Sequence, residues 1–211
     1  MSTTFDVYPR TRGLPSFRQL LDSSTSELHR FLGSVAIRAR PSIHMRLHRK
    51  SDNSHLEFEQ SDPLRWGADT YAWFMVGEVP GGTDAYFGEG ASAIREMWED
   101  KCNGPQCEQL EPLIRECLDV GHYWSFRRSA GQPAVISLAY GLIAGSLAAL
   151  TGGFLNSGDS GWESTRLPAQ PQEFLGYYFR PEHTLEPSFQ DWSRRCLASL
   201  AAELDETTPP R

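Results

Sequence analysis

The sequence lacks charge over a long stretch: from Ser129 to Gly158 it contains no Asp, Glu, Lys, Arg or His. Inside this stretch lies the apolar run AVISLAYGLIAGSLAAL, residues 134–150. A membrane-spanning helix needs roughly 20 predominantly apolar residues, whereas this run is shorter and is bounded by Pro133 and by Gly152-Gly153. Proline suits the first turn of a helix, and glycine suits its end. We therefore predict a buried core helix over 134–150, and a membrane span is the alternative.

Two glycines, Gly141 and Gly145, lie inside this predicted helix. Each costs about 1 kcal/mol relative to alanine in a helix interior. Because glycine has no side chain, we expect a sheet or a second helix to approach the backbone closely at both positions.

Basic residues are not in excess: 20 Lys and Arg stand against 27 Asp and Glu, which gives a net charge of -7. A sequence-independent nucleic-acid binder needs a basic face that displaces counterions from phosphates, so we expect no nucleic-acid partner. An acidic protein more naturally meets basic partners. The 211 residues, 39% of them hydrophobic, predict a single domain over 1–211 with a sizeable core.

The first residues, MSTTFD, have neither the basic start nor the apolar segment of a secretory signal, which predicts a cytoplasmic location. Cysteines are few: Cys102, Cys107, Cys117 and Cys196. The spacing of the first two does not match the two-residue gap of a zinc knuckle. We expect free, packed thiols, because a reducing compartment disfavours the alternative, a Cys102–Cys107 disulfide.

No short catalytic motif is present: the sequence has no Walker pattern, no dinucleotide-binding glycine fingerprint, no nucleophile elbow and no HExxH helix. His44, His48 and His55 lie near one another, but Arg46 stands between the first two and would repel a cation. We therefore predict no catalytic, cofactor-binding or metal-binding residue.

Four charged residues flank the apolar run: Arg127 and Arg128 before it, and Asp159 and Glu163 after it. The N-terminus of a helix favours anions, and two nearby carboxylates could work as an acid–base pair. One alternative is therefore a small enzyme with an anion site formed by these four residues. We favour ion pairs between the arginines and the carboxylates, which would give these residues and Trp162 a structural role.

Hydrophobic periodicity predicts a mixture of strands and helices. Apolar residues alternate with polar ones over 42–49, and this strand should form an antiparallel hairpin with 55–60 across a turn at 51–54. Further strands are predicted at 4–8, 71–79, 121–128 and 154–156. Helices are predicted at 15–32, 90–101, 108–118, 134–150, 172–179 and 188–204, with a frayed tail at 205–211. The expected fold class is α+β, an antiparallel sheet packed against several helices that include the buried central one.

The C-terminal half carries a longer pattern: YWSFRRSAGQPA, then LAYGLIAGSLAALTGGF, then SGDSGWE and EFLGYYFRPE, all within 123–182. This pattern resembles small bacterial immunity proteins that accompany polymorphic toxins or toxins of type VI secretion. The opening FDVYPRTRGLPSFRQLLDSSTSELHRFL is similar to such proteins as well. In the family form, the loop after the helix often has two aspartates before a small residue and Trp-Asp. This chain has Gly158-Asp159 and Trp162-Glu163 instead.

The resemblance implies a protein that binds a cognate toxin and occludes its active site. The acidic balance predicts a toxin with a basic cleft, because charge complementarity aids encounter while aromatic anchors supply affinity. Candidate contacts are the acidic and aromatic residues clustered over 61–100: Asp62, Trp66, Tyr71, Trp73, Glu78, Asp84, Tyr86, Glu89, Glu96, Trp98, Glu99 and Asp100. A structural or scaffolding subunit with a symmetric apolar interface is a further alternative.

Overall fold

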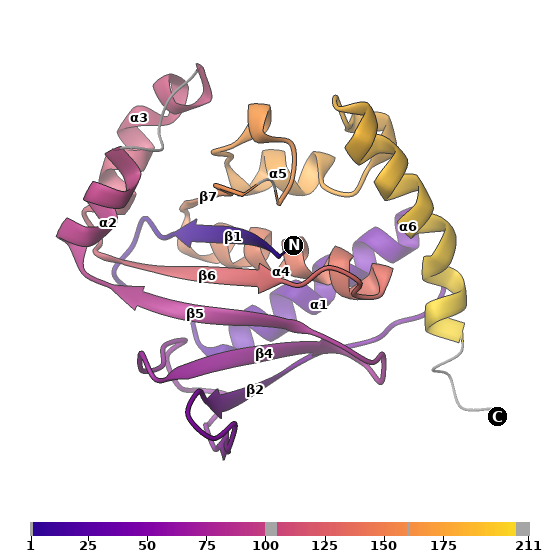
Figure 1. The fold of residues 1–211 in the computed structure, drawn as a ribbon, viewed down its shortest axis with the longest axis horizontal. Coiled ribbons are helices and arrows are strands. Elements are labelled where there is room, and N and C mark those ends of the chain that lie inside the picture. The colour runs from indigo at the N-terminus through magenta and orange to yellow at the C-terminus, as the bar shows by residue number, and fades with distance from the viewer. Residues whose placement is uncertain (1, 100–104, 160, 206–211) are drawn as a thin grey trace.

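The structure, a computed structural model, describes residues 2–99, 105–159 and 161–205. These residues contain one antiparallel sheet of seven strands in the order β3-β2-β4-β5-β6-β1-β7 (Figure 1). The strands are β1 (Thr3–Tyr8), β2 (Ile43–Arg49), β3 (His55–Leu56), β4 (Thr70–Val76), β5 (Thr83–Glu89), β6 (His122–Arg128) and β7 (Phe154–Asn156). The α-helices in the described part are α1 (Phe17–Ser34), α2 (Ala91–Glu99), α3 (Pro105–Leu118), α4 (Ala134–Thr151), α5 (Pro171–Tyr177) and α6 (Pro187–Asp205). The predicted α+β class is confirmed.

Helix α4 lies at the centre of the fold. It contacts β1, β4, β6 and β7 on one side and α1, α5 and α6 on its other sides (Figure 1). All of its residues except Ala149 and Leu150 are buried. Burial on every side accounts for the uncharged sequence, because an unpaired charge is very costly in the interior. The helix is long and apolar enough to cross a membrane, but 89% of that span is buried inside the fold, as is typical of a core helix.

The two glycines of α4 lie where another element approaches it. A side-chain carbon at Gly141 would lie 2.2 Å from the ring of Tyr178, and one at Gly145 would lie 2.7 Å from Leu175. The Tyr178 hydroxyl also donates a hydrogen bond of 2.7 Å to the carbonyl oxygen of Ser137. The expected close approach is confirmed, and α5 with the residue that follows it is the approaching element.

Helices α2 and α3 lie on the opposite face of the sheet from α4. Trp98 of α2 and Ile114 of α3 belong to a small apolar cluster that includes Tyr8, Tyr123 and Phe154 of the sheet. The two helices lie at one end of the sheet (Figure 1). Among the described residues, no helix packs over the rest of that face on β2, β4 and β5.

The predicted antiparallel hairpin is confirmed but is shorter than expected. β3 has only two residues, which pair with Leu47 and His48 of β2. The other edge of β2 pairs along its whole length with β4, from Ile43–Val76 to Arg49–Thr70. Residues 57–60 turn away from β2, because the backbone there hydrogen-bonds to the start of α1. The Gln60 carbonyl accepts a hydrogen bond from Arg18 N at 2.9 Å, at the start of α1.

Strand β5 is not predicted from the sequence, because Asp84 and Gly88 are of types depleted in strands. The other elements lie within a few residues of their predicted bounds. Asp205, predicted as tail, belongs to α6. Residues 100–101 of the predicted helix and 206–211 of the predicted tail lie outside the described residues.

Candidate functional site

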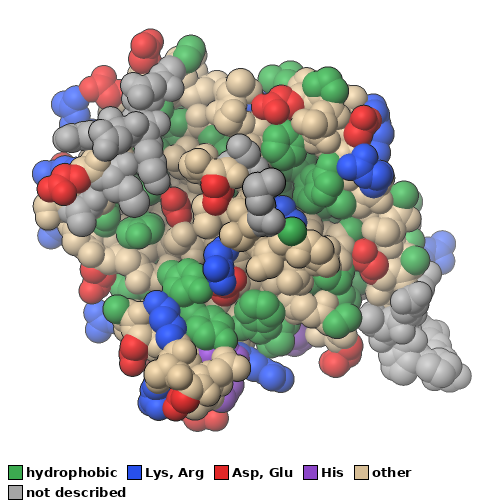
Figure 2. Space-filling model, in the orientation of Figure 1, with side chains coloured by type: hydrophobic (Ala, Val, Ile, Leu, Met, Phe, Trp, Pro, Cys, Tyr) green, Lys and Arg blue, Asp and Glu red, His purple; other side chains and the backbone are tan. Residues whose placement is uncertain are grey.

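The uncovered part of the sheet presents side chains from four neighbouring strands, and we call this surface the open face. Figure 2 looks onto it and shows hydrophobic side chains gathered over β4 and β5, with basic and histidine side chains beside them. Alternation along each strand places its polar and aromatic residues here and its apolar residues against α1 and α4. The open face consists of His44, Arg46, His48, Tyr71, Trp73, Met75, Asp84, Tyr86, Ser125 and Arg127.

Strand register places four of these residues in one row across the sheet. Arg46 lies opposite Trp73, Trp73 opposite Asp84, and Asp84 opposite Arg127. Directly paired residues on one face of an antiparallel sheet have side chains close enough to interact. The row therefore combines an aromatic ring with two guanidinium groups and one carboxylate.

Asp84 is the polar centre of the row. Its side chain is only 6% exposed, and its Oδ2 accepts hydrogen bonds from Arg127 Nε at 2.8 Å and from the Tyr86 hydroxyl at 2.6 Å. Partial burial, followed by this hydrogen bond and the charge of Asp84, raises the pKa of Tyr86 to about 12. The carboxylate thus holds both neighbouring side chains in place.

A second group of contacts orders the aromatic side chains beside this row. The rings of His48 and Tyr71 stack with centroids 5.3 Å apart. The Tyr71 hydroxyl hydrogen-bonds Oδ1 of Asn53 at 2.5 Å, and Lys50 Nζ lies 4.7 Å from the centre of the Tyr86 ring. Lys50 therefore adds a further positive charge at the margin of the open face.

The candidate contacts predicted over 61–100 do not form one surface. The predicted contacts Tyr71, Trp73, Asp84 and Tyr86 lie on the open face. Trp66 and Trp98 are buried, on opposite faces of the sheet. Burial removes these two tryptophans as surface anchors.

The remaining predicted acidic contacts are scattered. Asp62 lies beside the start of α1, where its carbonyl accepts Phe17 N at 3.2 Å. Glu78 follows β4, whereas Glu89 ends β5 at the far end of the same hairpin, and Glu96 is exposed on α2. The Glu99 side chain and Asp100 lie outside what the structure describes.

The four charged residues that flank α4 have separate partners. Arg127 pairs with Asp84, and Asp159 accepts hydrogen bonds of 2.8 Å from both the backbone N–H and the hydroxyl of Thr4. In the described part of the chain, neither arginine pairs with Asp159 or Glu163. The predicted ion pairs are therefore wrong, and so is the cluster on which the enzyme alternative depends. The sequence pattern alone could not show this, because successive residues of β6 point to opposite faces of the sheet.

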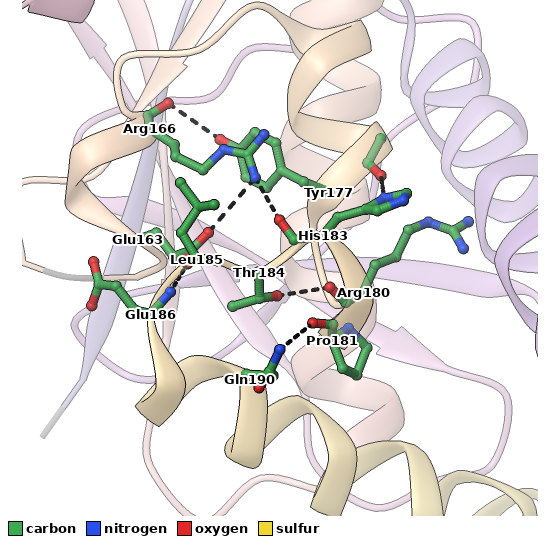
Figure 3. Close-up of polar contacts among 11 residues, drawn as sticks. Glu163, Arg166, Tyr177, Arg180, Pro181, His183, Thr184, Leu185, Glu186 and Gln190 are labelled. Carbon is green, nitrogen blue, oxygen red and sulfur yellow. Dashed lines mark hydrogen bonds and ion pairs between the residues drawn. The ribbon is translucent and has the colours of Figure 1, made fainter.

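Glu163 and Trp162 are both fully buried, which agrees with a structural role. The Glu163 Oε1 accepts hydrogen bonds of 2.5 Å from the backbone N–H groups of Leu185 and Glu186, just before α6 (Figure 3). Its Oε2 lies 3.8 Å from Arg166. Arg166 in turn stacks over the ring of Tyr177 at 3.7 Å, as Figure 3 shows. This carboxylate joins the loop after β7 to the start of the last helix.

The cysteine prediction is partly wrong. Cys117 and Cys196 are free, as expected, but Cys107 is disulfide-bonded. Its predicted alternative partner, Cys102, lies outside the described residues. Burial raises the pKa of the Cys117 thiol to about 12, so this thiol is un-ionised at neutral pH and is a packing residue. The described residues contain no group of three or more His, Cys, Asp or Glu side chains that could hold a metal ion.

The alternation of apolar and polar residues in β2 predicts part of the open face, because it places His44, Arg46 and His48 on one side of the strand. Arg127 and Met75 are missed as members, because only strand pairing brings them together with β2. Comparison of the chain with protein-family models, curated proteins and solved structures finds no match.

Proposed function

We propose that this protein binds a partner protein through the open face and acts as an immunity protein that occludes the active site of a bacterial toxin. The open face itself carries the proposal. Aromatic and arginine side chains lie on adjacent strands, and no helix of the described structure covers them. Tryptophan, tyrosine and arginine are the residues that most often dominate binding energy in interfaces. The step from a partner protein to a toxin rests on the resemblance of 123–182 to immunity proteins.

The open face is ordered before any partner arrives. The Trp73 ring packs so closely over Gly82 that a side-chain carbon there would lie 2.6 Å from it. Arg127 and Tyr86 are held by Asp84. Side chains that are already fixed lose less conformational entropy on association, which supports a role as binding anchors.

The charges of the open face refine the expected partner. Arg46 and Lys50 are basic, and Asp84 and Arg127 neutralise each other. The expectation of a basic cleft came from the net charge of the whole chain. The local charges favour a partner surface that combines carboxylates with apolar groups, because complementary charges steer encounter and set specificity.

Co-expression with the product of the neighbouring gene tests the proposal. We expect the two proteins to co-purify and the cells to survive expression of the toxin. Trp73→Ala should weaken the complex by roughly 30-fold or more, because a central tryptophan typically contributes 2 kcal/mol or more. Arg46→Glu should slow association and reverse its dependence on salt. Both quantities are measured by surface plasmon resonance at two ionic strengths.

Matched variants elsewhere on the molecule serve as controls. Leu185→Ala removes a hydrophobic side chain that is 69% exposed, and Arg12→Glu reverses a charge in an exposed loop. Both should leave affinity and protection unchanged. If the partner binds but the open-face variants behave like these controls, the proposed surface is wrong. If no complex forms and cells are not protected, the immunity function is wrong.

A further inference from the structure

A pocket of about 390 Å³ lies between the end of β6 and the start of α6, away from the open face. It is lined by Arg128, Gly161, Ser188, Phe189, Trp192 and Arg195. Two of these residues are arginines, two are aromatic and none is acidic. A pocket with this lining concentrates positive charge beside flat apolar surfaces.

Arg128 is held in this pocket without a counter-charge. Its guanidinium lies 5.4 Å from the centre of the Trp192 ring and 5.7 Å from that of Tyr140. Its terminal nitrogens make only long hydrogen bonds, 3.4 Å to the Ser137 hydroxyl and 3.3 Å to the Thr3 hydroxyl. Its Nε is buried and has no hydrogen-bond partner in the described structure. A buried donor on a charged group is costly to leave unsatisfied.

Among the described residues, no group around Arg128 forms an ion pair with it. Burial raises the pKa values of Tyr140, Tyr178 and Cys196 despite the nearby arginine, so all three are neutral at physiological pH. The carboxylate of Asp159 accepts hydrogen bonds from Thr4, and that of Glu203 accepts them from the N-terminus of α4. Within the described residues, neither Arg128 nor Arg195 lies within ion-pair distance of any carboxylate.

The N–H groups of Leu185 and Glu186, just before α6, already donate hydrogen bonds to Glu163. These two groups are therefore not free to bind an anion in the pocket. The pocket therefore has two guanidinium groups without an ion-pair partner in the described part of the chain. A phosphate monoester carries close to two negative charges at pH 7, as phosphorylated side chains do, and arginine binds phosphate through paired hydrogen bonds. Phe189 and Trp192 offer apolar surface to an aromatic group attached to such a phosphate.

We propose that this pocket binds a phosphate monoester that carries an aromatic group, with Arg128 and Arg195 holding the phosphate and Trp192 contacting the ring. The site is independent of the open face, so partner binding and ligand binding can succeed or fail separately. Tryptophan fluorescence reports on the pocket because Trp192 lines it.

The test titrates the full chain with phenyl phosphate at pH 7 and constant ionic strength, using calorimetry and tryptophan fluorescence. We expect saturable binding of one phenyl phosphate per chain, and weaker binding of both inorganic phosphate and benzoate. Arg195→Gln should weaken phenyl phosphate binding about tenfold or more, since a charge-assisted hydrogen bond typically contributes that much. Arg195 is exposed, so this variant should fold normally, which circular dichroism checks.

Arg194→Gln is the matched control, because Arg194 precedes Arg195 on α6, is exposed and pairs with Asp191 instead of lining the pocket. It should change affinity by less than about twofold. Non-saturable binding, or equal losses in the two variants, would overturn the site. Benzoate binding as tightly as phenyl phosphate would overturn the assignment to a phosphate monoester.

Discussion

At the scale of single residues, buried carboxylates organise this protein. Asp84 orders two side chains of the open face, and Glu163 anchors the start of α6. Each carboxylate accepts two hydrogen bonds and lies within 4 Å of an arginine, Arg127 for Asp84 and Arg166 for Glu163. This is the condition under which an ionised group can be buried without a large net cost.

The contact between Tyr86 and Asp84 predicts a pH dependence. The folded-state pKa of Tyr86, about 12, lies above the ordinary tyrosine value near 10. Its stabilising contribution is therefore complete below about pH 10 and is lost as the pH rises towards 12. We expect the difference in unfolding free energy between wild type and Tyr86→Phe to shrink over this range, as measured by urea denaturation at pH 9, 10 and 11.

Asp84→Asn provides the control for this effect. Removal of the charge should bring the Tyr86 pKa closer to 10. Phenolate absorbance near 295 nm follows the titration of the tyrosines, and the contribution of Tyr86 is obtained by comparison with Tyr86→Phe. An unchanged titration in Asp84→Asn would show that Asp84 does not contribute to the shift.

At the scale of elements, the packing of α5 against α4 depends on glycine. Gly141→Ala gains about 1 kcal/mol of helix propensity but places a methyl group on the Tyr178 ring, and overpacking of a core typically costs 1–3 kcal/mol. We expect a net loss of stability in thermal denaturation. The Tyr178 hydrogen bond to Ser137 should weaken with it, because the ring must move.

Gly176 of α5 is the matched control, because a side-chain carbon there meets no atom within 4 Å. Gly176→Ala should be neutral or stabilising. Equal behaviour of the two alanine variants would show that the tight contact at Gly141 relaxes freely.

The sequence predicts the individual helices and strands better than it predicts which of them lie next to one another. Hydrophobic periodicity identifies α1, α4 and most strands, because the pattern of buried and exposed residues in an element is visible in its own short segment of sequence. Periodicity fails at β5, because Asp84 and Gly88 have low strand propensity. Asp84 instead pairs with Arg127, and Gly88 leaves room for the Tyr123 ring. Strand order likewise depends on contacts between distant segments.

The same limit applies to the open face. Asp84, Tyr86 and the alternating residues of β2 are found from the sequence, but the row from Arg46 to Arg127 requires the register of four strands. Trp66 and Trp98 have the composition of interface anchors, and only tertiary packing shows that they are core.

At the scale of the whole molecule, the two ends of the described chain complete the core. β1 is an interior strand between β6 and β7, and α6 packs against α4. The Glu203 carboxylate accepts hydrogen bonds from Ala134 N at 2.9 Å and Val135 N at 3.0 Å. It takes the place of the side-chain cap that Pro133 cannot provide.

Glu203→Ala tests this long-range cap. It leaves two N–H groups at the start of α4 unpaired and removes a favourable charge, so we expect a loss of roughly 1–3 kcal/mol in unfolding free energy. Asp191→Ala on the same helix removes an exposed carboxylate and should change stability by less than about 0.5 kcal/mol. Equal effects in chemical denaturation would contradict the capping role.

The interior position of β1 also determines when the sheet can be completed during synthesis of the chain. β1 is synthesised before its partners β6 and β7, which follow more than a hundred residues later. The strands β2, β4 and β5 can pair with one another in the meantime, whereas β1 has no neighbouring strand until β6 has emerged. The nascent chain must therefore keep β1 unpaired while the segment between β1 and β6 is made.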